Sequence, residues 1–264
     1  MIIPDVCIET LFPQLLCEEK IARVAACGYR AAEIWMPEGK DACALRQAAE
    51  SHEISLCSMV VNAPNGSLGG APVDAGDLNK YLERTEQVIE FGAAAGIKRG
   101  ITCSGNVIPN LSNGEMRQNL VNALSRAADI AAHHDFVLLL EPLNTKVDHA
   151  GYFLDSSCVA AEVVREVGSP NLRLLWDIYH MQIMEGNVIA GIEANTDIIG
   201  HFHAAGVPGR HEITGGELNY AEIVRRIEAA GYSGTFGLEY IPAMEDHAES
   251  LKASLQGIMQ AKRN

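Results

Sequence analysis

Four short apolar runs in the second half of the sequence each end in a residue that can bind a metal or carry a proton. These residues are two glutamates, an aspartate and a histidine, at Glu141, Asp177, His203 and Glu239. They are separated by 36, 26 and 36 residues, and each interval has room for a loop, a helix and a return loop. Consecutive βα units would therefore carry the four side chains to the same end of a parallel sheet.

Three carboxylates and an imidazole gathered in one place favour a particular chemistry. Burying the acids at the ends of apolar strands costs several kcal/mol each unless they are paired or bind a cation. A dication removes their repulsion, and an oxygen-rich set with one imidazole suits Mg²⁺ or Mn²⁺ best, with Co²⁺ and Zn²⁺ as alternatives. The competing interpretation is that each acid separately caps a helix or pairs with a lysine or arginine. Four such residues on consecutive strands favour the metal site.

Further polar residues follow these strand ends. His180 lies three residues after Asp177, so in a helical turn both would face the same side, and His180 would reach a substrate oxygen. The alternative for His180 is a capping or core histidine. Arg210 and His211 follow His203 in the next loop, and Lys146 follows Glu141. A planar guanidinium suits a substrate carboxylate or phosphate, which favours Arg210, whereas Lys146 is typical of a solvated surface group.

The pattern of apolar residues and turn residues indicates alternating strands and helices along the whole chain. Strands are predicted at 6–9, 29–35, 54–61, 98–103, 137–141, 172–177, 198–203 and 235–239. Helices are predicted at 15–27, 41–52 with Asp41 as the N-cap, 78–95 closed by Gly96, 113–134, from a cap at Asp155 to Val167, 187–195, from a cap at Asn219 to Gly231, and 246–262.

Eight strands alternating with eight helices are typical of the (β/α)8 TIM barrel, and a doubly wound open sheet is the weaker alternative. No linker or change of composition interrupts the 264 residues, so we expect a single α/β barrel domain over 1–264. In such a barrel the active site lies at the carboxyl ends of the strands. The four candidate ligands are predicted to meet there.

The overall charge narrows the range of partners. The net charge is −14 and the isoelectric point is near 5.0, which argues against nucleic acid as a partner. There is no amino-terminal signal pattern and no apolar run long enough for a membrane span. The seven cysteines are scattered without a CxxC pair, as expected in a reducing compartment. We therefore expect a cytoplasmic protein that acts on a small molecule, and an acidic barrel of this size often forms a homo-oligomer.

Several stretches of the chain resemble the hydroxypyruvate isomerase family, within the xylose-isomerase-like (β/α)8 superfamily of sugar isomerases and epimerases. The likeness is specific over about residues 136–242 and general before them. It is carried by these segments: Glu141-Pro142-Leu143-Asn144, Asp177-Ile178-Tyr179-His180, His201-Phe202-His203-Ala204-Ala205-Gly206-Val207-Pro208-Gly209-Arg210-His211-Glu212, Gly216-Glu217-Leu218-Asn219-Tyr220 and Gly231-Tyr232-Ser233-Gly234-Thr235-Phe236-Gly237-Leu238-Glu239-Tyr240.

This resemblance implies specific roles for the candidate residues. Glu141, Asp177, His203 and Glu239 would bind the metal, and Glu141 and Glu239 would face each other across the substrate as an acid/base pair. The substrate contacts would come from His180 and Arg210. Two positions depart from the patterns of the relatives. Hydroxypyruvate isomerases often have Gln where this chain has His203, whereas histidine there resembles the ketose 3-epimerases. Those epimerases carry a glutamate six residues after the first metal glutamate, where this chain has Val147.

The resulting hypothesis is a metal-dependent isomerisation of a short hydroxy-keto acid or sugar, such as hydroxypyruvate to tartronate semialdehyde. One glutamate would remove a proton to form an enediolate and the other would return a proton. The alternatives are a ketose or ketose-phosphate 3-epimerase, then an inosose-dehydratase-like lyase. A non-catalytic barrel that binds sugar acids is a further alternative, but it has no need of opposed acid/base groups. The endonuclease branch of the superfamily needs more histidine and aspartate ligands than the sequence offers.

Overall fold

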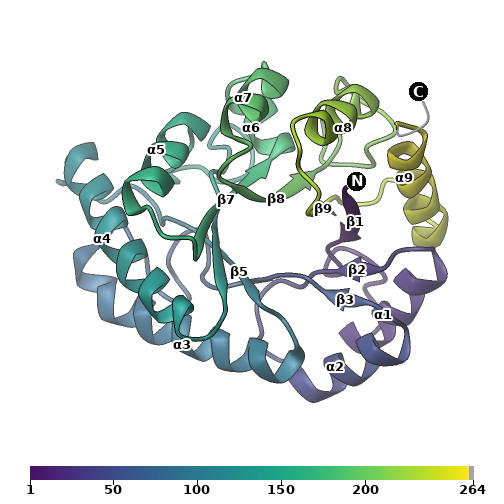
Figure 1. The fold of residues 1–264 in the computed structure, drawn as a ribbon, viewed down its shortest axis with the longest axis horizontal. Helices are drawn as coiled ribbons and strands as arrows, with labels where there is room; N and C mark the ends of the chain where they lie inside the picture. Colours follow the sequence, from purple (N-terminus) through teal and green to yellow (C-terminus); the bar gives the residue numbers. More distant parts are fainter. Residues whose placement is uncertain (262–264) are drawn as a thin grey trace.

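The strands line up in parallel to form the inner wall of a barrel, and the helices surround it (Figure 1). The computed structural model describes residues 1–261. Its strands are β1 (Ile3–Val6), β2 (Ala31–Ala32), β3 (Ser55–Leu56), β4 (Met59–Val60), β5 (Arg99–Thr102), β6 (Val137–Leu140), β7 (Leu172–Asp177), β8 (Ile199–Ala204) and β9 (Thr235–Leu238). The order of the larger sheet is β1-β9-β8-β7-β6-β5-β4, and β2 pairs with β3 beside it.

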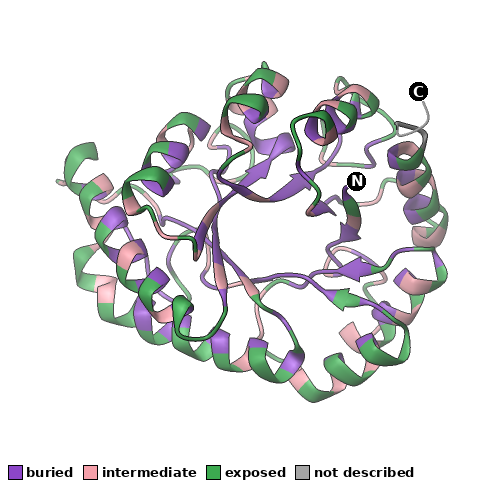
Figure 2. Cartoon of the chain, in the orientation of Figure 1, coloured by how far each residue is buried: buried purple, intermediate pink, exposed green. Residues whose placement is uncertain are grey.

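The helices lie between successive strands and cover the outside of the barrel (Figure 2). They are α1 (Cys17–Ala26), α2 (Ala42–Ser51), the 3-10 turn η1 (Ala75–Asp77), α3 (Leu78–Ala95), α4 (Asn113–Ala132), α5 (Ser157–Val167), α6 (Ile178–Met184), α7 (Val188–Asn195), α8 (Tyr220–Ala229) and α9 (His247–Ala261). The predicted TIM barrel is confirmed, since parallel strands alternate with helices throughout the described residues. None of the helices in residues 1–261 is both long and apolar enough to cross a membrane.

Local sequence signals account for several helix ends. The Asp41 carboxylate accepts hydrogen bonds from the backbone N–H groups of Cys43 and Ala44, as an N-cap should. Asn219 likewise caps α8 through the N–H of Glu222. Gly96 ends α3 in the left-handed conformation that glycine adopts without strain. These three predictions are confirmed.

Other boundaries differ from the predicted ones. The first strand runs from Ile3 to Val6 and not from Val6 to Glu9 as predicted. Beyond Val6 only one isolated bridge forms, at Cys7. The proposed cap at Asp155 is wrong: Ser156 occupies the N-cap, and the Asp155 carboxylate instead accepts a hydrogen bond from the Thr145 hydroxyl. An extra helix, α6, follows β7 directly. The predicted end of the last helix at residue 262 lies outside the described residues.

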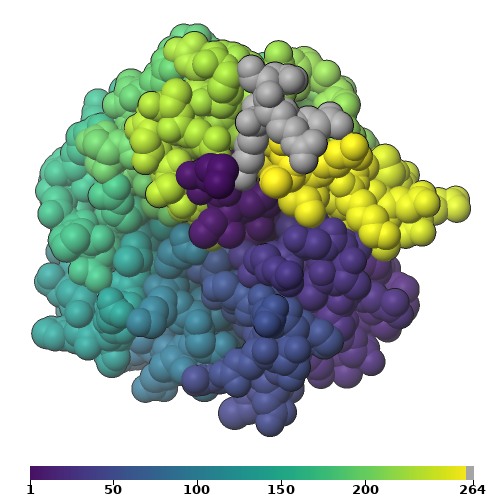
Figure 3. Space-filling view, turned by 45° about the vertical axis from the view of Figure 1, so that its right-hand side comes forward, coloured from purple at the N-terminus to yellow at the C-terminus, as the bar shows by residue number. Residues whose placement is uncertain are grey.

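The predicted strand 54–61 is divided into β3, which pairs with β2, and β4, which pairs with β5. Between β1 and β2 the main contact is a bridge of Cys7 with Glu33, with the Glu33 N–H bonded to Val6 O and its carbonyl bonded to the Ile8 N–H. The N-terminal segment also packs against the C-terminal part of the chain (Figure 3), as the parallel pairing of β1 with β9 requires. The ring of strands is thus complete, and a single bridge at Glu33 joins β1 to β2.

The interior of the barrel holds a small apolar cluster of its own. Ile101, Leu139 and Leu175 pack together there, separate from the larger core between strands and helices. Successive side chains of a strand point to opposite faces. Residues two positions beyond Leu139 and Leu175 therefore point into the barrel above this cluster, and these are Glu141 and Asp177.

Candidate active site at the carboxyl ends of the strands

The alternation along four neighbouring strands brings the predicted ligands together. Glu141 follows β6, Asp177 ends β7, His203 lies in β8 and Glu239 follows β9. Each offers one ligand atom within 4.8 Å of the others, and all four are buried. Backbone hydrogen bonds from Glu141 N to Thr102 O and from Glu239 N to Ala204 O extend the ladder to these positions. The side chains therefore stand on regular strand ends and not on mobile loops.

His203 lies among the three carboxylates. Its Nδ1 is 3.4 Å from Glu141 Oε1, 3.5 Å from Glu239 Oε2 and 4.0 Å from Asp177 Oδ2. Although it is buried, this nitrogen has no hydrogen-bond partner among the described residues. An orphaned imidazole nitrogen facing three carboxylate oxygens fits a divalent cation of the Mg²⁺ or Mn²⁺ type.

Electrostatics distinguishes the two glutamates. Burial, only partly offset by His203, raises the pKa of Glu141 to about 7. Burial acts on Glu239 in the same sense, but Arg210 and His203 hold the pKa of Glu239 far below its usual range. For His203, burial alone would lower the pKa, and the charges of Glu33 and Glu239 raise it well above its usual value. Without a bound cation, His203 thus favours its protonated form, and Glu141 is partly protonated at neutral pH.

Both oxygens of Glu239 accept hydrogen bonds from outside the ligand set. Trp35 Nε1 donates to Oε1 at 2.7 Å, and the Arg210 guanidinium donates to Oε2. Arg210 also lies over the ring of Tyr179, with 5.2 Å from its carbon to the ring centroid. A tight turn returns Arg210 to the site: Gly206 pairs with His211, and a Cβ at Gly206 would lie 2.7 Å from Glu212 O.

His180 lies at the start of α6, whose first turn is capped by the Asp177 carboxylate. The backbone N–H of Asn144 donates to His180 Nδ1 at 3.2 Å, so the ring proton resides on Nε2. Burial, reinforced by the charge of Arg210, lowers the pKa of His180 well below its usual value. Its Nε2 has no hydrogen-bond partner among the described residues. His180 is therefore a neutral donor beside the site.

A cavity of about 470 Å³ opens over these groups. It is lined by Glu141, His180, Arg210 and Glu239 from the predicted set, and by residues that the sequence interpretation missed: Glu9, Trp35, Lys40 and His149. Lys40 Nζ is paired with Glu9 Oε1 at 2.8 Å. Of the cations weighed from the sequence, Arg210 faces the site. Lys146 instead donates to the carbonyl groups of Ile183 and Met184 at the exposed surface.

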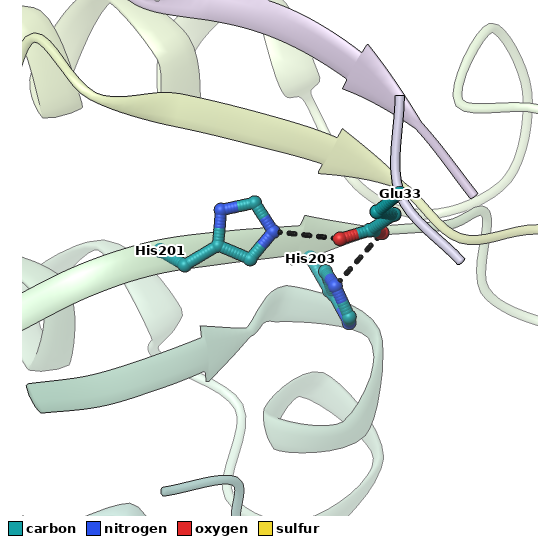
Figure 4. Close-up of side chains that lie close together, drawn as sticks. All are labelled: Glu33, His201 and His203. Atoms are coloured by element: carbon teal, nitrogen blue, oxygen red, sulfur yellow. Dashed lines mark hydrogen bonds and ion pairs between the residues drawn. The ribbon is translucent and has the colours of Figure 1, made fainter. Parts of the chain in front are cut away.

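A second polar layer, also missed from the sequence, lies behind His203. It contains Glu33, Ser58 and His201, all buried. Figure 4 shows Glu33 between the two histidines, with one carboxylate oxygen directed at each ring. The available signals were weak: His201 lies on the same strand face as His203, and Glu33 lies within a strand predicted to continue to Trp35.

Known proteins share this architecture and much of the sequence. The model of the xylose isomerase-like TIM barrel family matches residues 21–257. A human protein that bears the name hydroxypyruvate isomerase is 35% identical over 245 residues, which cover 88% of this chain and 87% of that protein. A 2-oxo-tetronate isomerase of Cupriavidus necator is 32% identical over 231 residues, 85% of this chain and 86% of its own length.

The same architecture is found in a solved structure titled as an AP endonuclease of family 2 from Brucella melitensis. It superposes with a TM-score of 0.87 at 27% identity, over 95% of this chain and 97% of that chain. The family model spans most of the sequence, and both curated relatives exceed 30% identity over most of it. This chain therefore belongs to the xylose isomerase-like TIM barrel family.

Proposed function

We propose that this protein is a metal-dependent isomerase of a small hydroxy-keto acid, of the hydroxypyruvate or 2-oxo-tetronate type. The observation that carries the proposal is the buried His203 Nδ1 facing the carboxylates of Glu141, Asp177 and Glu239. The names of the curated relatives support the same reaction class. We assign the metal to these four residues, with Mg²⁺ or Mn²⁺ as the ion.

In this scheme Glu141 and Glu239 are the catalytic pair. One removes the proton from the hydroxyl-bearing carbon, and the other delivers a proton to the former carbonyl carbon. The hydroxyl proton passes to the former carbonyl oxygen, so the substrate and product are isomers. A divalent ion, when bound, polarises the carbonyl and stabilises the negative charge of the enediolate.

Two further residues bind the substrate in this proposal. His180 lines the cavity, and its Nε2–H, 3.5 Å from Asp177 Oδ2, suits a substrate hydroxyl or carbonyl oxygen. Arg210 lines the same cavity and supplies the positive charge that a substrate carboxylate needs within a protein of net charge −14.

The second candidate is a ketose 3-epimerase, which uses the same metal set. One position favours the isomerase. Val147, where the resemblance leads us to expect the additional glutamate of the epimerases, is 67% exposed and is absent from the lining of the cavity. It therefore offers no carboxylate to a longer ketose.

A proton-exchange experiment tests both candidates. The purified protein is freed of bound metal and supplied with Mg²⁺. It is then incubated in D₂O with hydroxypyruvate, 2-oxo-tetronate, small ketoses and ketose phosphates, and the reaction is followed by NMR. Deuterium next to a keto-acid carbonyl with conversion to the isomer is expected, and label at ketose carbon 3 would indicate the epimerase. Loss of water from a substrate would identify a lyase, and metal binding without exchange a binding protein.

The two glutamates are tested separately. Glu141→Gln and Glu239→Gln should each abolish turnover while the fold survives, since each change removes one proton-transfer group and keeps the side-chain volume. Circular dichroism and thermal melting serve as the fold control. Near-normal turnover in either variant would exclude the two-glutamate scheme.

A further inference from the structure

The carboxylate of Glu33 lies next to the His203 ring, on the side of Nε2 (Figure 4). Glu33 Oε1 is 3.0 Å from His203 Nε2, on the opposite side of the ring from the nitrogen that faces the three carboxylates. Glu33 is 1% exposed and does not line the cavity. It therefore cannot contact the substrate, and its effect on the site must pass through His203.

We propose that Glu33 is the positioning residue of His203: it holds the proton on Nε2 and so keeps the Nδ1 lone pair directed at the metal. This inference rests on the metal site proposed above. A neutral imidazole has one donor and one acceptor nitrogen, and the partner of the donor decides which nitrogen remains for a metal. Glu33 Oε1 lies 3.0 Å from His203 Nε2, within reach of a hydrogen bond, and neither atom has another hydrogen-bond partner among the described residues.

Glu33 can do this because its other oxygen is held in place. Glu33 Oε2 accepts a hydrogen bond of 2.5 Å from Ser58 Oγ and lies 3.1 Å from His201 Nε2. The second nitrogen of His201 lies 2.7 Å from Thr235 Oγ1, which also accepts a hydrogen bond from Arg99. His201 therefore links the threonine to Glu33 through its two ring nitrogens.

The backbone of the barrel wall packs closely against Glu33, His201 and His203 at Gly237. A Cβ on Gly237 would lie 3.0 Å from Glu33 Oε1, from His201 Nε2 and from His203 Cδ2. The close approach of the three side chains thus depends on the missing side chain at this position. The Glu33 backbone is fixed as well, by its hydrogen bonds to Val6 O and from Ile8 N.

The test compares metal affinity in wild type, Glu33→Gln and Glu33→Asp. Mn²⁺ binding is measured without substrate by titration calorimetry and by electron paramagnetic resonance. Glu33→Gln removes the negative charge that favours the Nε2 proton, and we expect Mn²⁺ to bind 10- to 100-fold more weakly. Glu33→Asp keeps the negative charge but moves it farther from His203 Nε2, because the side chain is one methylene shorter. We expect a smaller loss of Mn²⁺ affinity in this variant. Ser58→Ala keeps the charge of Glu33 and removes only one of the two contacts to Oε2, so we expect a smaller loss of affinity than in Glu33→Gln.

Several outcomes would overturn the inference. Unchanged Mn²⁺ affinity in a folded Glu33→Gln variant would do so, as would an effect of Ser58→Ala equal to that of Glu33→Gln. Binding of two ions by wild type and one by Glu33→Gln would make Glu33 a ligand. Wild type that binds no Mn²⁺ would instead refute the metal site itself, which separates the two failures.

A measurement on wild type alone covers the case in which the variants do not fold. Protein labelled with ¹⁵N at histidine is examined by NMR with saturating Mg²⁺, which is diamagnetic. The His203 proton is expected on Nε2, with Nδ1 shifted by the ion. A proton on Nδ1 and metal-dependent shifts at Nε2 would overturn the inference.

Discussion

The indole nitrogen of Trp35 donates a 2.7 Å hydrogen bond to Glu239 Oε1, from a position 204 residues away in the sequence. Arg210 donates to the other oxygen of the same carboxylate. Two donors outside the ligand set thereby orient the Glu239 carboxylate, whereas the Glu141 carboxylate has His203 as its neighbour, with Nδ1 3.4 Å from Oε1. The two glutamates of the proposed acid/base pair are therefore held differently.

Replacement of Trp35 by phenylalanine is expected to reduce turnover while leaving the fold intact. The change keeps an aromatic side chain but removes the donor to a charged oxygen, an interaction of about 1.5 to 3 kcal/mol. We expect kcat to fall about 10- to 100-fold. The measurement is the rate of isomerisation at saturating substrate. Val147→Ala, a truncation at the exposed rim, is the control, and equal rates for Trp35→Phe and wild type would contradict this role.

Arg210→Gln is expected to shift the pH profile. Glu239 must be ionised to act as a base or ligand, and Arg210 holds the pKa of Glu239 low. Without the guanidinium that pKa rises, so the acidic limb of kcat/KM should move to higher pH. The profile is measured between pH 4 and 8. An acidic limb at the same pH in both proteins would show that Arg210 does not tune Glu239.

His180→Gln should weaken substrate binding and leave metal binding unchanged. Glutamine keeps a donor near the cavity but cannot reproduce the position of Nε2, which the Asn144 N–H fixes from the opposite side of the ring. We expect KM to rise about tenfold, or about 1.4 kcal/mol. Because the pKa of His180 is lowered well below its usual value, the wild-type rate should show no titration of this residue above pH 6. A loss of Mn²⁺ affinity would instead place His180 among the ligands.

Metal binding is expected to release protons. The pKa of Glu141 is raised to about 7 by burial, and that of His203 is raised well above its usual value. At pH 7 His203 therefore favours its protonated form and Glu141 is protonated in about half of the molecules, and a cation must displace these protons. Calorimetry in two buffers of different ionisation enthalpy should give different heats, and the affinity should rise from pH 6 to pH 8. Identical heats in both buffers would contradict the protonated state of the empty site.

Asp5→Asn is expected to stabilise the protein at neutral pH. Burial, reinforced by the charge of Glu33, raises the pKa of Asp5 from 3.8 to about 8. The unfolded chain loses this proton at much lower pH, so the folded protein loses stability as pH rises through this window. Asparagine resembles the protonated acid and should gain about 4 kcal/mol at pH 7, or about 10 °C in melting temperature.

The control for this prediction is the pH itself. At pH 4 the Asp5 carboxyl is protonated in the folded state and nearly half protonated in the unfolded chain, so most of the gain should be lost there. The melts are made in EDTA, so that metal binding does not contribute. A difference in melting temperature between Asp5→Asn and wild type that stays the same from pH 4 to pH 8 would show that Asp5 carries no such penalty.

The second half of the barrel could be predicted well from the sequence because its strands end in a visible pattern. Apolar runs closed by Glu141, Asp177, His203 and Glu239 follow the two-residue alternation of a strand. The structure brings all four together. Loop lengths and a composition without interruptions were enough to indicate the barrel.

The first half carried weaker signals. The apolar run 54–61 is continuous in the sequence, but only β3 and β4 within it form ladders. The sequence predicts Trp35 as the last residue of a strand. The neighbouring residues in the sequence do not indicate that its indole contacts Glu239, 204 positions away. The cap at Asp155 failed for a similar reason, since a hydroxyl from the preceding loop took the carboxylate. Partners brought in by the fold decide these cases.

The position of Glu33 at the closure of the barrel has a consequence for the order of folding and metal binding. On the role proposed for Glu33, a metal site of full strength requires His203 and a glutamate about 170 residues earlier in the chain. Contacts of such long range form late in folding. Partly folded chains would then bind the ion weakly. The cation would bind tightly to, and so stabilise, only chains in which Glu33 and His203 are already in contact.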